Sequence, residues 1–457
     1  MSDTMLDLSR WQFAITVAFH MTFPAVTVGL SIFLAFVYGA YLRTRKPVYL
    51  QIFRFWKRIF AVGFALGVVA GTVITFEFGL NWGPFASATG PVIGPIIGME
   101  VVTAFFVEAG FIGVMLYGDG RVKERTVFLA TCIVALGTVL STTWIIAANS
   151  WLQTPAGYKI VDGQFQPSDW WHVVFNPSFG WRFPHMLLGV LIAAAWMITG
   201  ISAYYLARGR EQQFARRTLS LALGVLAVLL PLQLDVGDHV AGNYVAKYQL
   251  SKLEALEGNW DSTNTGYNIF AIPDPTHQRN KVLVTIPTIG SWIGAKDLSG
   301  KSPTPGLSLT KKADQPNMWP TFWGFRVMFY GSMLMFIAVL ASIVLRLRRR
   351  LFSTRWFHVF LTWLTPVGVL AIIGGWVTAE TGRQPWVVYG QLRTADGVSH
   401  LSTGAVVFSV VGFLAIYLTL AITWVAYVVR QVRRGPLAAD LEPTLLPPAE
   451  PVPEMGV

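Results

Sequence analysis

The chain has 457 residues, of which 53% are hydrophobic and 13% charged, and its mean hydropathy is +0.51. Soluble domains carry roughly a quarter charged residues, so a single large soluble core is excluded and several membrane spans are indicated. A formal charge of +11 would suit a nucleic-acid binder as well as a membrane protein, and the placement of the charge decides between the two.

Nine apolar segments are long enough to cross a bilayer, and they predict an all-α, multi-pass membrane protein. The first segment is too long for the apolar core of a cleavable signal peptide, so we expect it to be retained. The single cysteine, Cys132, lies inside the fourth segment, which excludes an intrachain disulfide and a cysteine-based metal site. The expected spans are 12–42, 59–80, 98–118, 127–150, 184–207, 218–238, 321–345, 358–380 and 403–429.

Basic residues gather in every second connection between these spans. The clusters lie within 43–58, 208–217, 346–355 and 430–434, whereas 81–99 contains no basic residue. By the positive-inside rule, the N-terminus is expected outside and the C-terminus inside. The net charge is therefore a topology signal with contact to anionic lipid, and no nucleic-acid partner is expected.

The spans and connections divide the chain into four parts. Residues 1–238 hold the first six spans, 320–434 hold the last three, and 435–457 form a tail rich in Pro and Glu that is expected to be disordered and inside. Between them, 239–319 is polar and rich in Gly, Pro, Asn and Asp, with helical spacing at 250–260. A connection of this size in an otherwise economical protein is usually functional or disordered.

Polar and metal-capable side chains occur at one level of the predicted bundle, in its outer half. Charged groups at membrane depth are costly and mark functional sites. Imidazole, thioether and carboxylate groups at a shared level indicate a buried cofactor, and a His/Met pair favours a six-coordinate, electron-transferring haem. Taken singly, a His within the membrane can instead bond a neighbouring helix, and most Met residues fill packing gaps. The residues are His20, Glu77, Glu100, Glu108, His185, Arg326, Met328 and Glu380.

Two further patterns qualify this cofactor hypothesis. Glu100 and Glu108 are separated by about 12 Å along an ideal α-helix and by about 80° around it, which suits two stations of one proton path, although two separately satisfied carboxylates are an alternative. In the segment 375–386, Glu380 ends an apolar run and is followed by Arg383, a pattern that an interfacial belt of Trp and Arg would also give. Trp376, one turn before Glu380 on the same face, would pack against a macrocycle or against another helix.

A series of ordered motifs runs along the chain. They are Leu8-Ser9-Arg10-x-Gln12-Phe13 leading to His20, Gly79-x-Asn81-Trp82, Glu100 through Glu108, His185, Gly237-Asp238, Lys252 to Glu257, Phe325-Arg326-x-Met328 and 375–386. These motifs resemble subunit I of the cytochrome bd-type quinol oxidases over essentially all nine spans. The compact outer connection resembles the short-loop branch of that family. Some members of the family carry haem b in place of haem d and resist cyanide.

The resemblance implies a set of haem ligands. His185 and Met328 would ligate a low-spin haem b, with Arg326 close to it. His20 and Glu380 would be the axial ligands of two high-spin haems, one a haem b and the other a haem d or a further haem b. Oxygen would bind at one of these two high-spin haems.

It also implies roles for the remaining polar residues. Glu100 and Glu108 would carry protons to the oxygen site. Trp376 and Arg383 would line the haem cluster, and Arg10 would face it from the first span. Lys252 and Glu257 would lie near the quinol head group, within an outer quinol-binding loop at 239–319.

The implied reaction is oxidation of quinol at the outer face of a bacterial cytoplasmic membrane. Protons would be released outside, and oxygen would be reduced to water with protons drawn from the inside, so that charge is separated. Members of the family work with a second membrane subunit, and some carry a small single-span third subunit.

Three rival classes make different predictions. A haem-copper oxidase needs more histidines than the seven present here, and no two of these are adjacent. A proton-coupled transporter would use His20, Glu100 and Glu108 as a relay, but it leaves the His/Met pair unexplained and would be colourless. A membrane cytochrome b without an oxygen site would show only low-spin haem spectra and consume no oxygen.

Overall fold

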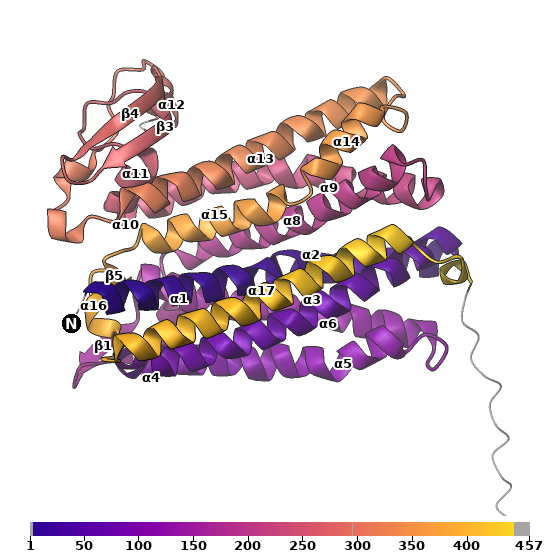
Figure 1. Ribbon diagram of the computed structural model, residues 1–457, viewed down its shortest axis with the longest axis horizontal. Coiled ribbons are helices and arrows are strands. Elements are labelled where there is room, and N and C mark those ends of the chain that lie inside the picture. Colours follow the sequence, from indigo (N-terminus) through magenta and orange to yellow (C-terminus); the bar gives the residue numbers. More distant parts are fainter. Residues whose placement is uncertain (1–2, 295, 443–457) are drawn as a thin grey trace, which may run out of the picture.

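A computed structural model describes residues 3–294 and 296–442 of the chain as a bundle of long helices that run side by side (Figure 1). Most of the tail predicted to be disordered, residues 443–457, lies outside the described residues. In the described part, nine helices or helix pairs are long and apolar enough to cross a membrane. The predicted nine-span, all-α class is therefore confirmed.

The spans agree with the expected segments and extend several of them. Pro24 and Pro366 interrupt the first and the eighth span, because proline removes a backbone donor and restricts the residue before it. The spans consist of α1 (Asp3–Thr22) with α2 (Pro24–Thr44), α3 (Pro47–Leu80), α4 (Gly83–Glu100) with η1 (Val101–Phe105) and α5 (Phe106–Tyr117), α6 (Glu124–Gln153), α8 (Phe179–Ala207), α9 (Gln212–His239), α13 (Met318–Leu347), α14 (Arg355–Trp363) with α15 (Val367–Thr381), and α17 (Thr403–Arg434).

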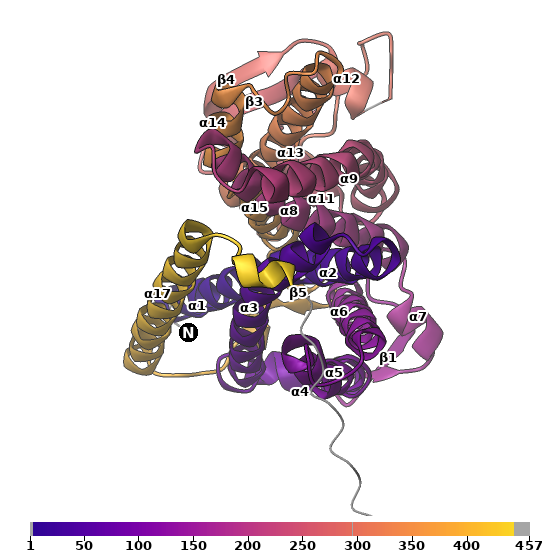
Figure 2. The ribbon, with the colours of Figure 1, turned by 90° about the vertical axis from the view of Figure 1, so that its right-hand side faces the viewer.

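The helices form two groups when the bundle is viewed along its axis. Figure 2 shows α8, α9, α13 and α15 on one side and α1 to α6 with α17 on the other. Helix α2 packs on α8 and joins the groups. The four basic clusters lie at one end of the bundle, here called the inner end, together with the 3₁₀ turn η5 (Ala438–Leu441).

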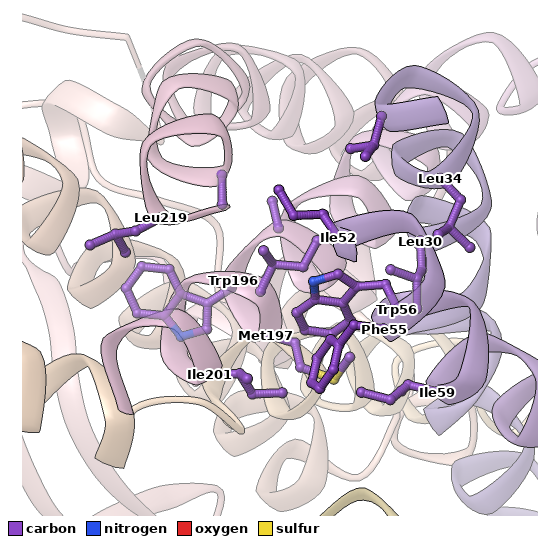
Figure 3. Close-up of a cluster of buried hydrophobic side chains, with 14 of the residues drawn as sticks. Leu30, Leu34, Ile52, Phe55, Trp56, Ile59, Trp196, Met197, Ile201 and Leu219 are labelled. Atoms are coloured by element: carbon purple, nitrogen blue, oxygen red, sulfur yellow. The ribbon is translucent and has the colours of Figure 1, made fainter. Parts of the chain in front are cut away.

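The inner half of the bundle is a tightly packed apolar core (Figure 3). Trp56 of α3 and Trp196 of α8 are fully buried in it, among Leu30 and Ile52. The Trp196 indole N–H donates to the Leu364 carbonyl over 2.7 Å, at the break between α14 and α15. The polar residues of this half are mainly Ser and Thr, such as Ser202 and Thr218, which bond each other, whereas the candidate ligands lie outside this core.

The opposite, outer end carries the small elements that connect the spans. Helix α9 continues through the π-helix η2 (Val240–Val245) and α10 (Ala246–Tyr248), so the sixth span extends past its expected boundary at 238. The outer loop proper contains α11 (Leu250–Glu257), as the spacing at 250–260 predicts, and an antiparallel hairpin of β3 (Tyr267–Asp274) and β4 (Arg279–Ile286). The other elements are α12 (Ile289–Ile293), η3 (Leu307–Leu309), η4 (Lys312–Asp314), the hairpin β1 (Tyr158–Val161) and β2 (Gln164–Pro167), α7 (Trp170–Val174), the pair β5 (Trp386–Val388) and β6 (Leu392–Arg393), and α16 (Thr394–Gly397).

Candidate functional site

The predicted ligand His185 and the aromatic Trp376 lie at one level of the bundle. A Cβ at Gly189 of α8 would lie 2.9 Å from Ile372 Cδ1 of α15, so the two helices touch there. His185 is one turn outward from Gly189, and Trp376 is one turn outward from Ile372. The two side chains therefore belong to the same layer.

Met328 of α13 meets this layer from the other side of α15. A Cβ at Gly375 would lie 2.7 Å from Met328 Sδ, so the sulfur packs directly on the backbone beside Trp376. The His185 ring lies against α9, where a Cβ at Gly237 would approach its Cε1 to 3.4 Å. Gly237 and Gly375 therefore leave room beside His185 and Met328. Residue spacing in the sequence did not show that these two side chains lie in one layer.

One nitrogen of the His185 imidazole is buried and unpaired. The backbone carbonyl of His185 accepts a bond from Gln233 Nε2 at 3.1 Å, but the ring Nδ1 has no hydrogen-bond partner among the described residues. Buried polar atoms are normally paired, and exceptions need a physical reason. A ring that serves as a metal ligand provides such a reason.

Glu380 lies one turn outward from Trp376 and is held by a cluster of polar side chains. Asn149 Nδ2 donates to Glu380 Oε1 over 2.9 Å, and Gln153 Nε2 donates to the same oxygen over 3.3 Å. The second carboxylate oxygen pairs with Arg383, and Arg182 donates to the side-chain oxygen of Asn149. The carboxylate is thus oriented by α6 and by the turn after α15.

Three arginines around this cluster keep unpaired N–H groups in buried positions. The atoms are Arg10 Nε, Arg182 Nη1, and Arg383 Nε and Nη1, none of which has a partner in the described part of the chain. Buried cationic donors without acceptors are costly. They fit a bound group with anionic substituents, such as the propionates of a haem, next to a candidate carboxylate ligand.

Lys252 points inward from the outer loop and does not face the solvent. It is 2% exposed, and its ammonium donates to Gln153 Oε1 over 2.7 Å. Burial holds the pKa of Lys252 well below its usual range, with Arg182 adding repulsion and Glu380 opposing it. The chain Lys252–Gln153–Glu380 therefore joins the outer loop to a predicted haem ligand through two hydrogen bonds.

Arg326 fastens the outer loop to α13. The side chain is fully buried, and it donates through Nε to the Asn268 carbonyl (2.9 Å) and through Nη1 to the Leu256 carbonyl (3.2 Å). Glu257 lies 3.8 Å from Arg326 Nη2. Burial raises the pKa of Glu257, and Arg326 opposes the rise. Of the two residues expected at the quinol head group, Glu257 thus sits at the loop–helix junction.

His20 packs against α3 at a pair of glycines one turn apart. Its Nδ1 lies 3.2 Å from the Gly67 carbonyl, and a Cβ at Gly71 would approach its Cε1 to 3.1 Å. Arg10 lies further out than His20 on α1, and its Nη2 donates to Gln384 Oε1 over 3.4 Å. Arg10 thus contacts the segment 375–386, and its orientation toward a haem cluster stays a prediction.

Glu100 and Glu108 both face α6, and the helix between them is not regular. The π-helix η1 lies between them, and its wider turn rotates the chain less per residue, so it removes much of the expected 80° offset. Ser141 Oγ donates to Glu100 Oε1 over 2.8 Å, and a Cβ at Gly137 would lie 2.6 Å from Glu108 Cγ. Gly137 and Ser141 are one helical turn, about 6 Å, apart, so the two carboxyls are neighbours along α6.

Several polar residues of the site were missed by sequence reasoning. Gln249 Nε2 bonds both the carbonyl and the side-chain oxygen of Gln153 at 3.0 Å, and Tyr244 donates to Gln249 Oε1 over 2.7 Å. A signal was present on α6, where Asn149 and Gln153 form an i,i+4 polar pair near the end of an apolar span.

These features define a polytopic helical membrane protein of the redox type, with candidate haem ligands and protonatable groups in its outer half. The chain belongs to the cytochrome bd terminal oxidase subunit I family, whose model it matches over residues 8–436. Membership confirms the predicted resemblance to subunit I and disfavours the transporter alternative.

Relatives and a solved structure agree with this assignment. The chain is 31% identical to the cytochrome bd ubiquinol oxidase subunit 1 of Bacillus subtilis (strain 168), over 94% of each chain. It is 30% identical to the cytochrome bd-II ubiquinol oxidase subunit 1 of Escherichia coli (strain K12), over 96% of this chain and 98% of that one. The bd oxidase from Geobacillus thermodenitrificans has the same fold, with a TM-score of 0.87 at 27% identity, covering 94% and 99% of the chains.

These relatives confirm the predicted enzyme class, a quinol:oxygen oxidoreductase. The family also implies haem cofactors and a second subunit, because its members are named as subunit I of a cytochrome.

Proposed function

We propose that this chain is the haem-carrying subunit of a terminal oxidase that oxidises quinol at its outer end and reduces oxygen to water. The observation that carries the proposal is the layer formed by His185, Met328 and Trp376, with Glu380 one turn further out. Such a set of imidazole, thioether and carboxylate groups matches what haem iron accepts as ligands.

The residues would divide between the haems as follows. His185 and Met328 would hold a low-spin haem b, and His20 and Glu380 would hold two high-spin haems, one of them haem b and the other haem d or haem b. Arg10, Arg182 and Arg383 would pair with propionates through their free N–H groups. When bound, the haems supply one-electron transfer and the iron that binds oxygen.

The protein's own part in quinol oxidation lies at the junction of the outer loop and α13. Each quinol releases two electrons and two protons, so a base must stand beside it. Glu257 suits this role because burial raises its pKa, and Arg326 fixes its position. Lys252 would act one layer deeper, through Gln153, on the orientation of Glu380.

Protons for oxygen reduction would reach the site along α6. Glu108 and Glu100 form successive stations there, and Ser141 holds the outer one. The inner end would supply these protons and the outer end would release those from quinol, so the reaction would separate charge across a bacterial cytoplasmic membrane. The orientation follows from the basic inner end. A second membrane subunit, and in some members a small third one, would complete the enzyme.

The first test is a reduced-minus-oxidised visible spectrum of the detergent-purified complex, together with oxygen uptake on added quinol. We expect low-spin b-type bands, with a far-red band if haem d is present, and oxygen consumption. Bands of b type without oxygen uptake would leave only an electron-passing cytochrome. A folded preparation without haem bands would restore the transporter alternative.

Replacing Glu108 with Gln should slow oxygen reduction by roughly tenfold or more, because proton delivery through a positioned side chain contributes at least that much. Steady-state oxygen uptake measures the loss. Reduction of the haems by quinol under anaerobic conditions should stay near the wild-type rate, because that half-reaction draws no proton through α6. Normal turnover in the variant would remove Glu108 from the proton path.

Replacing Gln153 with Leu should lower the unfolding temperature, because it removes the nearest acceptor of the buried Lys252 side chain and leaves the Tyr244 hydroxyl 3.5 Å away. Poorly satisfied buried polar groups cost about 1–3 kcal/mol. Adding Lys252→Met should restore part of the loss, since the buried amino group is then gone. Thermal unfolding of the two variants in detergent tests this, and equal losses in both would show that the Lys252–Gln153 bond contributes nothing.

A further inference from the structure

Another buried carboxyl group, that of Glu77, lies on the side of α3 away from the Glu100–Glu108 pair. Glu77 is 1% exposed, and neither of its carboxyl oxygens has a hydrogen-bond partner among the described residues. Figure 2 shows α1 and α17 on one side of α3 and α5 and α6 on the other. The function proposed above gives Glu77 no role.

Two hydroxyl groups from other helices share its environment. Thr16 of α1 and Tyr417 of α17 are 0% and 3% exposed, and both hydroxyl oxygens lack a partner in the part of the chain that the structure describes. Thr16 interacts with Glu77 and with Tyr417, yet forms a well-aligned hydrogen bond with neither. Tyr417 is held in place by stacking on Phe19, with ring centroids 4.4 Å apart. Three helices thus bring unpaired polar atoms to one point.

An ionised carboxylate is not stable in these surroundings. Among the described residues, no Lys or Arg forms an ion pair with Glu77, and the polar side chains that interact with it are Thr16 and Tyr417. A buried carboxylate without a counter-charge takes up a proton instead of remaining charged. The resulting acid has a donor and an acceptor, and water bridging to the hydroxyls would satisfy the groups that make no direct bond.

The cluster lies next to His20 along the α1–α3 contact. Thr16 is one turn before His20 on α1, and Glu77 is about 9 Å along α3 from Gly71, the residue against which His20 packs. Of the elements packed on α3 here, α17 presents Tyr417, α1 presents His20, and α4 presents no charged side chain at this level. Glu77 is therefore the acid of this group.

We propose that Glu77, Thr16 and Tyr417 form a binding site for water and one exchangeable proton beside His20. The use of this site as a proton reserve for oxygen reduction rests on the proposed function. The binding of a proton by Glu77 does not depend on that function. The site would lie on the α1–α17 side of α3 and would be separate from Glu100 and Glu108, which face α6.

Infrared spectroscopy of the purified complex tests the site. Wild type minus Glu77→Gln should show the loss of one carboxylic-acid C=O stretching band, and that band should shift in heavy water because its proton exchanges. The matched control is Asp162→Asn, which changes an exposed turn residue between β1 and β2 and should leave the band in place. Identical carboxylic-acid absorption in wild type and Glu77→Gln would overturn the proposal, as would a band that does not shift.

Two milder variants keep the test decisive if Glu77→Gln does not fold. Thr16→Val and Tyr417→Phe each remove one hydroxyl group. In each variant the Glu77 carboxylic-acid band should be shifted from its wild-type position, because its hydrogen bonding is weaker. No movement in either variant would overturn the shared site. The visible spectrum of the same preparation is recorded as well. If the haem bands are absent but the infrared band is present, the proposed oxidase function fails and the proton site stands.

Discussion

Replacing Met328 with Leu is expected to abolish the low-spin haem signal while the protein keeps its fold. The Met328 sulfur packs on Gly375 in the layer of His185 and Trp376, and Leu has a similar volume but no atom that can bind iron. The reduced-minus-oxidised spectrum measures the effect as lost or displaced low-spin bands. Oxygen uptake on quinol should fall to a small fraction of wild type, because the first electron acceptor is missing.

A matched control lies on the same helix. Met335 is 1% exposed and belongs to the apolar core of the inner half, so Met335→Leu makes the same chemical change two turns away. This variant should keep both the low-spin bands and the activity, with a stability change below about 1.5 kcal/mol. An unchanged low-spin spectrum in Met328→Leu would rule out the ligand role of Met328.

The architecture could be predicted because the bilayer imposes strict periodicities. Apolar runs of span length and alternating basic connections give the number of helices and the polar level at which His185 and Glu380 occur. Each of these signals is local in the chain and repeated, so it survives errors of a few residues at the span ends. The sixth span was expected to end at 238, but η2 and α10 continue the helix to Tyr248, through a segment that contains Gly242 and Asn243.

The details of the site could not be predicted, because they depend on non-local contacts and on irregular helix geometry. The offset of Glu100 and Glu108 was computed for an ideal helix, and the π-helix between them turns both toward α6. Gln153 stands at the end of an apolar span, and its partner Lys252 lies 99 residues further along the chain. Only packing brings the two together.

Replacing Glu380 with Gln is expected to have the largest effect of any single change in the site. It removes a candidate haem ligand and leaves Arg383, which is 5% exposed, without its carboxylate. Breaking a buried pair by neutralising one partner costs about 3–5 kcal/mol, since the remaining charge is uncompensated. We therefore expect a large fall in the unfolding temperature together with loss of one high-spin haem, measured by thermal unfolding and by haem content per protein.

The outer surface offers a comparison that isolates the effect of burial. Asp314 pairs with Arg393 in the same chemical way, but these side chains are 30% and 37% exposed. Exposed pairs contribute roughly 0–1 kcal/mol, so Asp314→Asn should leave the unfolding temperature and the haem content near wild type. If Glu380→Gln behaved like Asp314→Asn in both measurements, Glu380 would be neither a ligand nor a structural partner of Arg383. If it lost stability but kept all its haem, the carboxylate would serve only to neutralise Arg383, and another residue would have to hold the second high-spin haem.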